Sequence, residues 1–219
     1  MPDHSRTIAA DPTQGSSGLS YLLARNRAWV ARRAEGSNAG TAPAPDECPP
    51  EIFWIGCSDS RVLPNEIVGL EPGEVLVHRN MANLAPINDF NSRSVLQFAV
   101  EALGVRHIVV VGHHGCRAME LAGTHGGNGL IDHWLAPVRE LYRTHHDELQ
   151  AIGDDAARHN RLCELNVRWQ VQCLTRNPVV TKAWKNGQRL SLHGWVCETG
   201  TGMLTDLGIS CDGLSPTAL

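Results

Sequence analysis

The sequence has few aromatic residues, no long apolar run and no cluster of one charge sign. Phe, Trp and Tyr together make up 5% of the 219 residues. A membrane-spanning helix needs about 18 to 20 consecutive apolar residues, and no stretch approaches that length. The polar start of the chain lacks the apolar segment of a secretory signal. We therefore expect a soluble, cytoplasmic protein with no membrane partner.

Positive charge is also scarce. The formal net charge is -4, and no run of Lys and Arg is present. Such a chain lacks the electrostatic footprint that nucleic acid or an anionic membrane surface requires. We expect no nucleic-acid partner and favour a small neutral or anionic substrate.

Cysteine is present, but not in the pattern of a disulfide-rich domain. The seven cysteines are odd in number and widely spaced, whereas small secreted domains carry dense sets of paired cysteines. This usage favours a reducing compartment. There, each cysteine is a buried small hydrophobic residue, a metal ligand or a reactive thiol.

The sequence predicts one domain that follows an N-terminal extension. Residues 1–18 are polar and lack periodicity, which predicts disorder. With 42% apolar residues, the remaining 19–219 can bury one core as a single domain. Apolar residues at helical spacing over 19–34 predict an N-terminal helical arm.

Two buried strands with a helix between them define the fold class. The continuous apolar runs over 52–57 and 107–112 predict strands covered on both faces. Between them, an apolar stripe ending at Gly104 predicts a helix capped by Ser92 or Ser94. This order favours an α/β fold, in which helices flank a mostly parallel sheet. Later patterns predict helices over 130–149, 158–176 and 179–185, and strands near 190–196 and 203–209.

Metal-binding residue types follow both buried strands. Cys57 ends the first, and His113 and Cys116 follow the second. Carboxyl ends of parallel strands meet at one edge of a sheet, so these three side chains can converge. Thiolate and imidazole are the ligands that zinc prefers, and three of them leave a fourth position open. A buried cysteine and an unrelated histidine would also explain each residue separately. A following helix N-terminus favours the thiolate, which supports the metal site.

Asp59 and Arg61 lie two and four residues beyond Cys57. The pair could form a local salt bridge that braces the loop. Beside a metal ion, the carboxylate could instead orient a coordinated water, with Arg61 holding it in place. It could also take the fourth metal position itself.

Five motifs together resemble the β-class carbonic anhydrases, and the resemblance runs from about Leu19 to about Ile209. They are Gly56–Arg61, Glu71–Leu84, Ser94–Val100, Gly112–Cys116 and His193–Trp195. The resemblance implies an α/β sheet whose subunits form a homodimer or a tetramer, with CO2 and bicarbonate as the substrate pair.

The same resemblance assigns roles to the residues at the strand ends. It implies that Cys57, His113 and Cys116 bind one Zn²⁺ per subunit, and that Asp59 and Arg61 form a catalytic dyad. Zinc hydroxide would then attack CO2 and give bicarbonate.

The chain departs from the family around this site. Arg117 and Ala118 stand where the family usually has two glycines, and Cys48 stands where many members have a glutamine near the substrate pocket. Arg117 is either a solvated residue or a cation that favours an anion in the pocket. The residues that bind a regulatory bicarbonate in one bacterial subgroup are matched in part, by Trp54 and Arg79, while the tyrosine position holds Cys197.

Two alternatives to carbonic anhydrase activity remain at the level of sequence. One is a hydrolase of carbonyl sulfide or carbon disulfide on the same scaffold. The other is a non-catalytic subunit with a structural or bicarbonate-sensing role. The matching ligand and dyad residues favour CO2 hydration over both.

Overall fold

The computed structural model describes residues 19–35, 49–124 and 129–213. The chain divides into two units, Met1–Pro43 and Ala44–Leu219. In the first, helix α1 (Ser20–Glu35) confirms the predicted helical arm. The predicted disorder of residues 1–18 lies outside the described residues, and the grouping of α1 with the rest as one domain stays a prediction. No helix among the described residues is long and apolar enough to cross a membrane.

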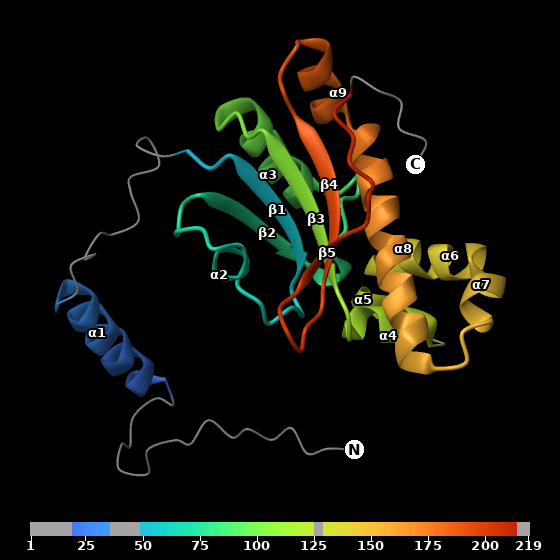
Figure 1. The fold of residues 1–219 in the computed structure, drawn as a ribbon, viewed down its shortest axis with the longest axis horizontal. Helices are drawn as coiled ribbons and strands as arrows, with labels where there is room; N and C mark the ends of the chain where they lie inside the picture. The colour runs from blue at the N-terminus through green and yellow to red at the C-terminus, as the bar shows by residue number, and fades with distance from the viewer. Residues whose placement is uncertain (1–18, 36–48, 125–128, 214–219) are drawn as a thin grey trace. The chain divides into compact units, whose positions relative to one another are not determined.

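One mixed sheet forms the centre of the second unit (Figure 1). Its strand order within the described residues is β2-β1-β3-β4-β5. Four strands are parallel, and the short β5 pairs with β4 in antiparallel fashion. This arrangement confirms the predicted mostly parallel sheet. The bounds are β1 Ile52–Cys57, β2 Val75–Asn80, β3 His107–His113, β4 Ser191–Cys197 and β5 Leu204–Asp206.

Helices flank the sheet as predicted. The longest described helix is α8 (Asp155–Thr175), which packs against β3 and β4. Helices α4 to α7 gather around one end of α8 (Figure 1). The other bounds are α2 Pro64–Val68, α3 Phe90–Gln97, α4 Arg117–Gly123, α5 Leu130–Trp134, α6 Ala136–Thr144, α7 His146–Gln150 and α9 Pro178–Lys185.

Two local predictions were wrong. The helix predicted over 130–149 is three short helices, with non-helical backbone at Leu135 and His145. The first break has a clear cause, because Pro137 follows it and a proline ring clashes with the preceding helical turn. The cap of α3 is Asp89, whose side chain accepts a hydrogen bond from the Ser92 N–H at 2.8 Å.

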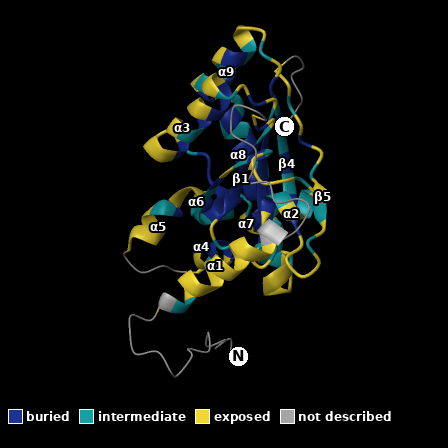
Figure 2. Ribbon diagram, turned by 90° about the vertical axis from the view of Figure 1, so that its left-hand side faces the viewer, coloured by how far each residue is buried: buried dark blue, intermediate teal, exposed yellow. Residues whose placement is uncertain are grey.

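The buried core lies where α8 meets the sheet. Figure 2 shows β1 and much of α8 in the colour of buried residues. One apolar cluster joins the strands to α8 and α9, with Phe53, Ile108, Leu192 and Val171 among its members. A second cluster joins α4, α6 and α8, and it includes Cys57 and Cys116. Two of the three residues predicted to bind metal are therefore part of the apolar interior, and the third, His113, is also buried.

Helix α8 approaches β3 closely at a glycine. A Cβ atom on Gly112 would lie 2.6 Å from the Cys163 sulfur and 2.8 Å from a methyl of Val167. Atoms cannot pack that tightly, so a larger residue here would have to push these side chains aside. This close approach fixes the end of β3 directly before His113.

Candidate metal centre

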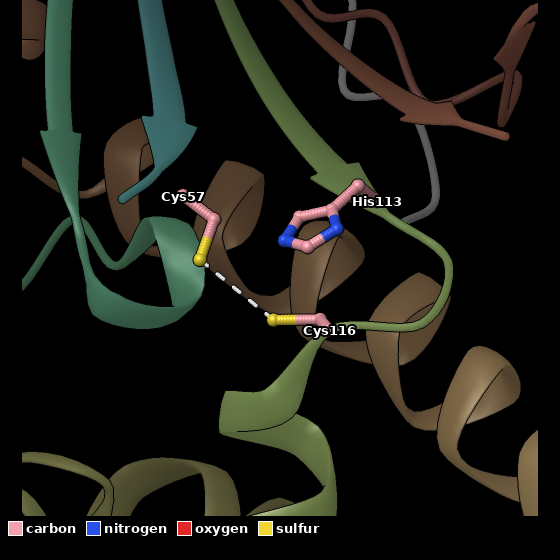
Figure 3. Close-up of side chains that lie close together, drawn as sticks. All are labelled: Cys57, His113 and Cys116. Atoms are coloured by element: carbon pink, nitrogen blue, oxygen red, sulfur yellow. Dashed lines mark hydrogen bonds between the residues drawn. The ribbon is translucent and has the colours of Figure 1, made fainter. Parts of the chain in front are cut away.

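The structure brings together the three residues predicted as metal ligands. Cys57 is the last residue of β1, His113 is the last of β3, and Cys116 directly precedes α4. Their ligand atoms all lie within 4.8 Å of one another, and all three residues are buried. Figure 3 shows the imidazole of His113 facing the two sulfur atoms. The carboxyl ends of neighbouring parallel strands converge here, as the sequence predicts.

The spacing and chemistry of this group fit a zinc ion. The sulfur atoms of Cys57 and Cys116 are 3.7 Å apart. Two sulfurs bound to a tetrahedral zinc at about 2.3 Å lie about 3.8 Å from each other. Both ring nitrogens of His113 are buried and have no hydrogen-bond partner among the described residues. Such unpaired buried groups are costly, and metal coordination would satisfy one of them.

Hydrogen bonds prepare Cys57 to act as a thiolate. The largest effect on its pKa is a hydrogen bond from Cys116, which lowers it; burial acts in the opposite direction. Backbone N–H groups of Asp59 and Ala82 also donate to the Cys57 sulfur, at 3.4 and 3.3 Å. The same hydrogen bond raises the pKa of Cys116, since that thiol supplies the shared proton. A metal ion that bound both sulfurs would displace this proton.

The carboxylate of Asp59 is anchored to the start of α4. Its Oδ2 atom accepts a hydrogen bond from the backbone N–H of Arg117 at 3.0 Å. Cys116 is the N-cap of this helix and offers no side-chain hydrogen bond, so the first amide groups are open to another acceptor. The helix dipole favours a negative charge at that place.

The structure places the side chains of Arg61 and Arg117 at the surface. Arg61 is exposed, and no ion pair joins it to Asp59 in the part of the chain that the structure describes. The Arg117 side chain is also exposed, while its backbone amide holds the carboxylate. The sequence left Arg117 as either a solvated residue or a cation near the pocket; it did not indicate the contact that its main-chain N–H makes with Asp59.

Trp54, Arg79 and Cys197 line one small cavity beside Cys57. Its volume is about 10 Å³, room for roughly one water molecule. The Arg79 guanidinium donates to the backbone oxygens of Cys57 at 3.2 Å and Ser60 at 2.8 Å, and to that of Val62. In this conformation Arg79 braces the loop that carries Asp59. Cys48, the remaining predicted pocket residue, lies outside the described residues.

Several residues that the sequence did not indicate make hydrogen bonds to the metal-binding residues or to the turn beside them. Ala82 follows β2 in a short turn (η1, Met81–Asn83), and Asn166 and Gln170 lie on α8. The Cys163 thiol donates to the His113 carbonyl oxygen at 3.3 Å. One signal could have indicated α8: polar Asn166 and Gln170 occur four residues apart in the apolar stripe of a predicted helix.

Comparison with known proteins identifies the family. The family model described as carbonic anhydrase matches residues 52–204. A carbonic anhydrase of Emericella nidulans is 43% identical over 211 residues, which cover 93% of this chain and 92% of that protein.

Solved structures agree. A Coccomyxa β-carbonic anhydrase in complex with acetazolamide superposes with a TM-score of 0.82 at 35% identity, covering 90% of each chain. A tetrameric β-carbonic anhydrase from Sordaria macrospora has a TM-score of 0.80 at 37% identity, covering 87% of this chain and 97% of that one. With the family model, these matches show that the chain belongs to the carbonic anhydrase family, in its β class.

Proposed function

We propose that Cys57, His113 and Cys116 hold the zinc ion of this carbonic anhydrase, one ion per subunit. The protein interconverts CO2 and bicarbonate and depends on zinc, as its family does. Bound there, zinc supplies Lewis-acid chemistry that makes hydroxide available from water near neutral pH. The observation that carries this assignment is the 3.7 Å separation of two buried sulfurs beside an unpartnered buried imidazole.

Asp59 is the residue that we assign to orienting the attacking water. Its Oδ2 atom accepts a hydrogen bond from the Arg117 amide, which fixes the position of the carboxylate two residues beyond Cys57. The second carboxylate oxygen can accept a hydrogen bond from the water and direct its lone pair toward CO2. Arg61 is the second member of the proposed dyad. It lies exposed two residues from Asp59 on the same loop, and we assign it to supporting the negative charge of that carboxylate.

CO2 hydration is favoured over the two alternatives. The Emericella nidulans relative is named a carbonic anhydrase, and the match covers 92% of its length. Cys57, Asp59, Arg61, His113 and Cys116 are all present. Hydrolysis of carbonyl sulfide or carbon disulfide, or a non-catalytic sensing role, has no comparable support.

The assembly and compartment are also proposals. We infer a homodimer or a tetramer, since the Sordaria macrospora relative is described as tetrameric. A cytoplasmic location is supported by the cysteines, because none of the six described ones forms a disulfide, as expected in a reducing compartment.

Stopped-flow CO2 hydration on the zinc-loaded protein tests the proposed site. We expect turnover between about pH 7 and 9, the range that follows from the acidity of water activated by zinc. Cys57→Ser should lower both zinc content and turnover, while Asp59→Ala should lower turnover and keep the zinc. A protein that holds zinc but shows no hydration across that pH range would contradict the proposal.

A further inference from the structure

Two amide side chains lie fully inside the apolar interior on one face of α8. Asn166 and Gln170 are 0% and 3% exposed, one helical turn apart and next to leucine and valine residues of the core. Burying an amide without a hydrogen-bond partner costs about 1 to 3 kcal/mol. Two such groups in a core therefore require specific partners.

Their partners form one ordered chain of hydrogen bonds. Gln170 donates from Nε2 to Asn166 Oδ1 at 2.9 Å, and Asn166 donates from Nδ2 to the Ala82 carbonyl oxygen at 2.9 Å. The Ala85 backbone N–H donates to Gln170 Oε1, also at 2.9 Å. The Gln170 donor fixes which way the Asn166 amide faces, and the two amides together hold both ends of the segment 82–85.

The segment that they hold is strained. Ala82 and Asn83 have φ values of 67° and 47°, the left-handed region that side chains with a Cβ disfavour. Asparagine tolerates this region, but an alanine held there costs of the order of 1 kcal/mol or more and stays there only when its surroundings fix it. Here the conformation directs the Ala82 N–H at the Cys57 sulfur, 3.3 Å away.

We propose that Asn166 and Gln170 are positioning residues of the metal centre, which hold the Ala82 amide against the Cys57 thiolate and so set its donor strength. The proposal rests on the zinc site proposed above. A hydrogen bond to a ligating sulfur withdraws charge from it, and such outer contacts tune a metal centre. When the amide turns away, the sulfur donates more charge and zinc becomes a weaker Lewis acid. The enzyme then needs a higher pH to reach the same kcat.

Asn166→Asp is the primary test, because it keeps the size of the side chain and places an oxygen opposite the Ala82 carbonyl. We expect kcat at neutral pH to fall about tenfold, the lower end of the range for lost outer contacts. The midpoint of the kcat pH profile should move to higher pH, so that much of the loss is recovered in alkaline buffer. In the cobalt-loaded protein, the sulfur-to-cobalt charge-transfer band should move to longer wavelength.

Gln170→Met is the second variant, and it carries the test if Asn166→Asp does not fold. It removes the anchor of the Asn166 amide without adding charge, so we expect shifts in the same directions and of smaller size. Val171→Ala is the matched control: Val171 is fully buried on the same helix and belongs to the apolar core. It should lower the unfolding temperature and leave the band and the pH midpoint unchanged.

The outcomes separate the two proposals. If both amide variants keep the wild-type band and pH midpoint while Cys57→Ser changes the band, the positioning role is wrong and the zinc site stands. If Cys57→Ser leaves the metal content and the band unchanged, the ligand assignment itself is wrong. Equal shifts in Val171→Ala and the amide variants would show a general packing effect and would overturn the positioning role.

Discussion

Cys57 and His113 end neighbouring parallel strands, but the structure holds them by different means. Around Cys57, two backbone N–H groups reach the sulfur, Arg79 braces the loop that follows, and Asn166 secures the Ala82 turn. The His113 ring has no hydrogen-bond partner among the described residues. Its place is set by the close approach of α8 at Gly112, together with the Cys163 thiol on its carbonyl oxygen.

The metal centre is therefore supported in two ways, by hydrogen bonds around Cys57 and by side-chain packing around His113. Hydrogen bonds adjust the charge of the thiolate and the direction of the carboxylate, so changes on the Cys57 side should alter chemistry more than stability. Packing fixes where the imidazole lies, so changes on the His113 side should alter stability first. Four sets of variants test this division, from the largest expected effect on activity to the smallest.

Asp59→Ala should have the largest effect among variants that keep the zinc. We expect kcat to fall by about 100-fold or more, the usual scale for removing a group that handles the attacking water. Asp59→Asn keeps the shape and can still accept from the Arg117 amide, so its loss should be smaller. Stopped-flow kinetics with parallel zinc analysis measures both. Turnover near the wild-type value in Asp59→Ala would remove Asp59 from the mechanism.

Arg79→Met should release the loop after β1. The guanidinium contacts three backbone oxygens of this loop, and methionine can replace none of them. We expect kcat to fall about 10- to 100-fold, as for lost supporting contacts at metal sites, with a smaller change in unfolding temperature. Arg79→Lys, with one compact donor group, should recover part of the activity. An unchanged kcat in Arg79→Met would show that the loop holds its shape without the brace.

Substitutions at Arg117 can distinguish the role of its backbone N–H, which contacts Asp59, from the role of its charged side chain. Arg117→Pro removes the N–H that holds Asp59, and proline is well tolerated at the first position of a helix. We expect a loss of roughly tenfold in kcat for this variant, from one lost hydrogen bond to a charged group. Arg117→Ala keeps the N–H and should stay near wild type. If alanine were the more damaging change, the cationic side chain and not the amide would be the functional group.

Gly112→Ala tests the role of packing between α8 and β3 beside His113. Its methyl group meets Cys163 and Val167, so the free energy of unfolding should fall by about 1 to 3 kcal/mol. The folded fraction should retain kcat within about twofold, the smallest effect on chemistry of the four sets. Adding Cys163→Ala should return part of the lost stability, which denaturant titration would detect. A large loss of kcat without a loss of stability would show that packing around His113 controls the chemistry as well, and would contradict the comparison.

The central architecture follows from local sequence patterns. The apolar run over 52–57 matches β1, and Pro64 begins α2 where its fixed backbone angle and missing N–H suit a first turn. Strand-helix-strand order then places Cys57 and His113 at one edge of a parallel sheet. These features are local or topological, so a single sequence contains them.

The supporting contacts do not follow from such patterns. Asp59 binds an amide 58 residues away, and Asn166 binds a carbonyl 84 residues away. Neither pairing produces a periodic pattern in the sequence. Proximity along the chain suggests only Arg61 as a partner of Asp59. Helix segmentation after residue 130 was missed because the apolar stripe continues across breaks at Leu135 and His145.

The left-handed turn at Ala82 has a consequence for protein engineering. Replacing a residue at positive φ with glycine is a common way to relieve backbone strain and raise thermal resistance. At Ala82 that gain would be offset by the greater freedom of glycine in the unfolded chain. The more flexible backbone would also hold its N–H less firmly toward Cys57. A stabilisation campaign on this enzyme should therefore leave Ala82 in place and look for tolerant positions far from the sulfur.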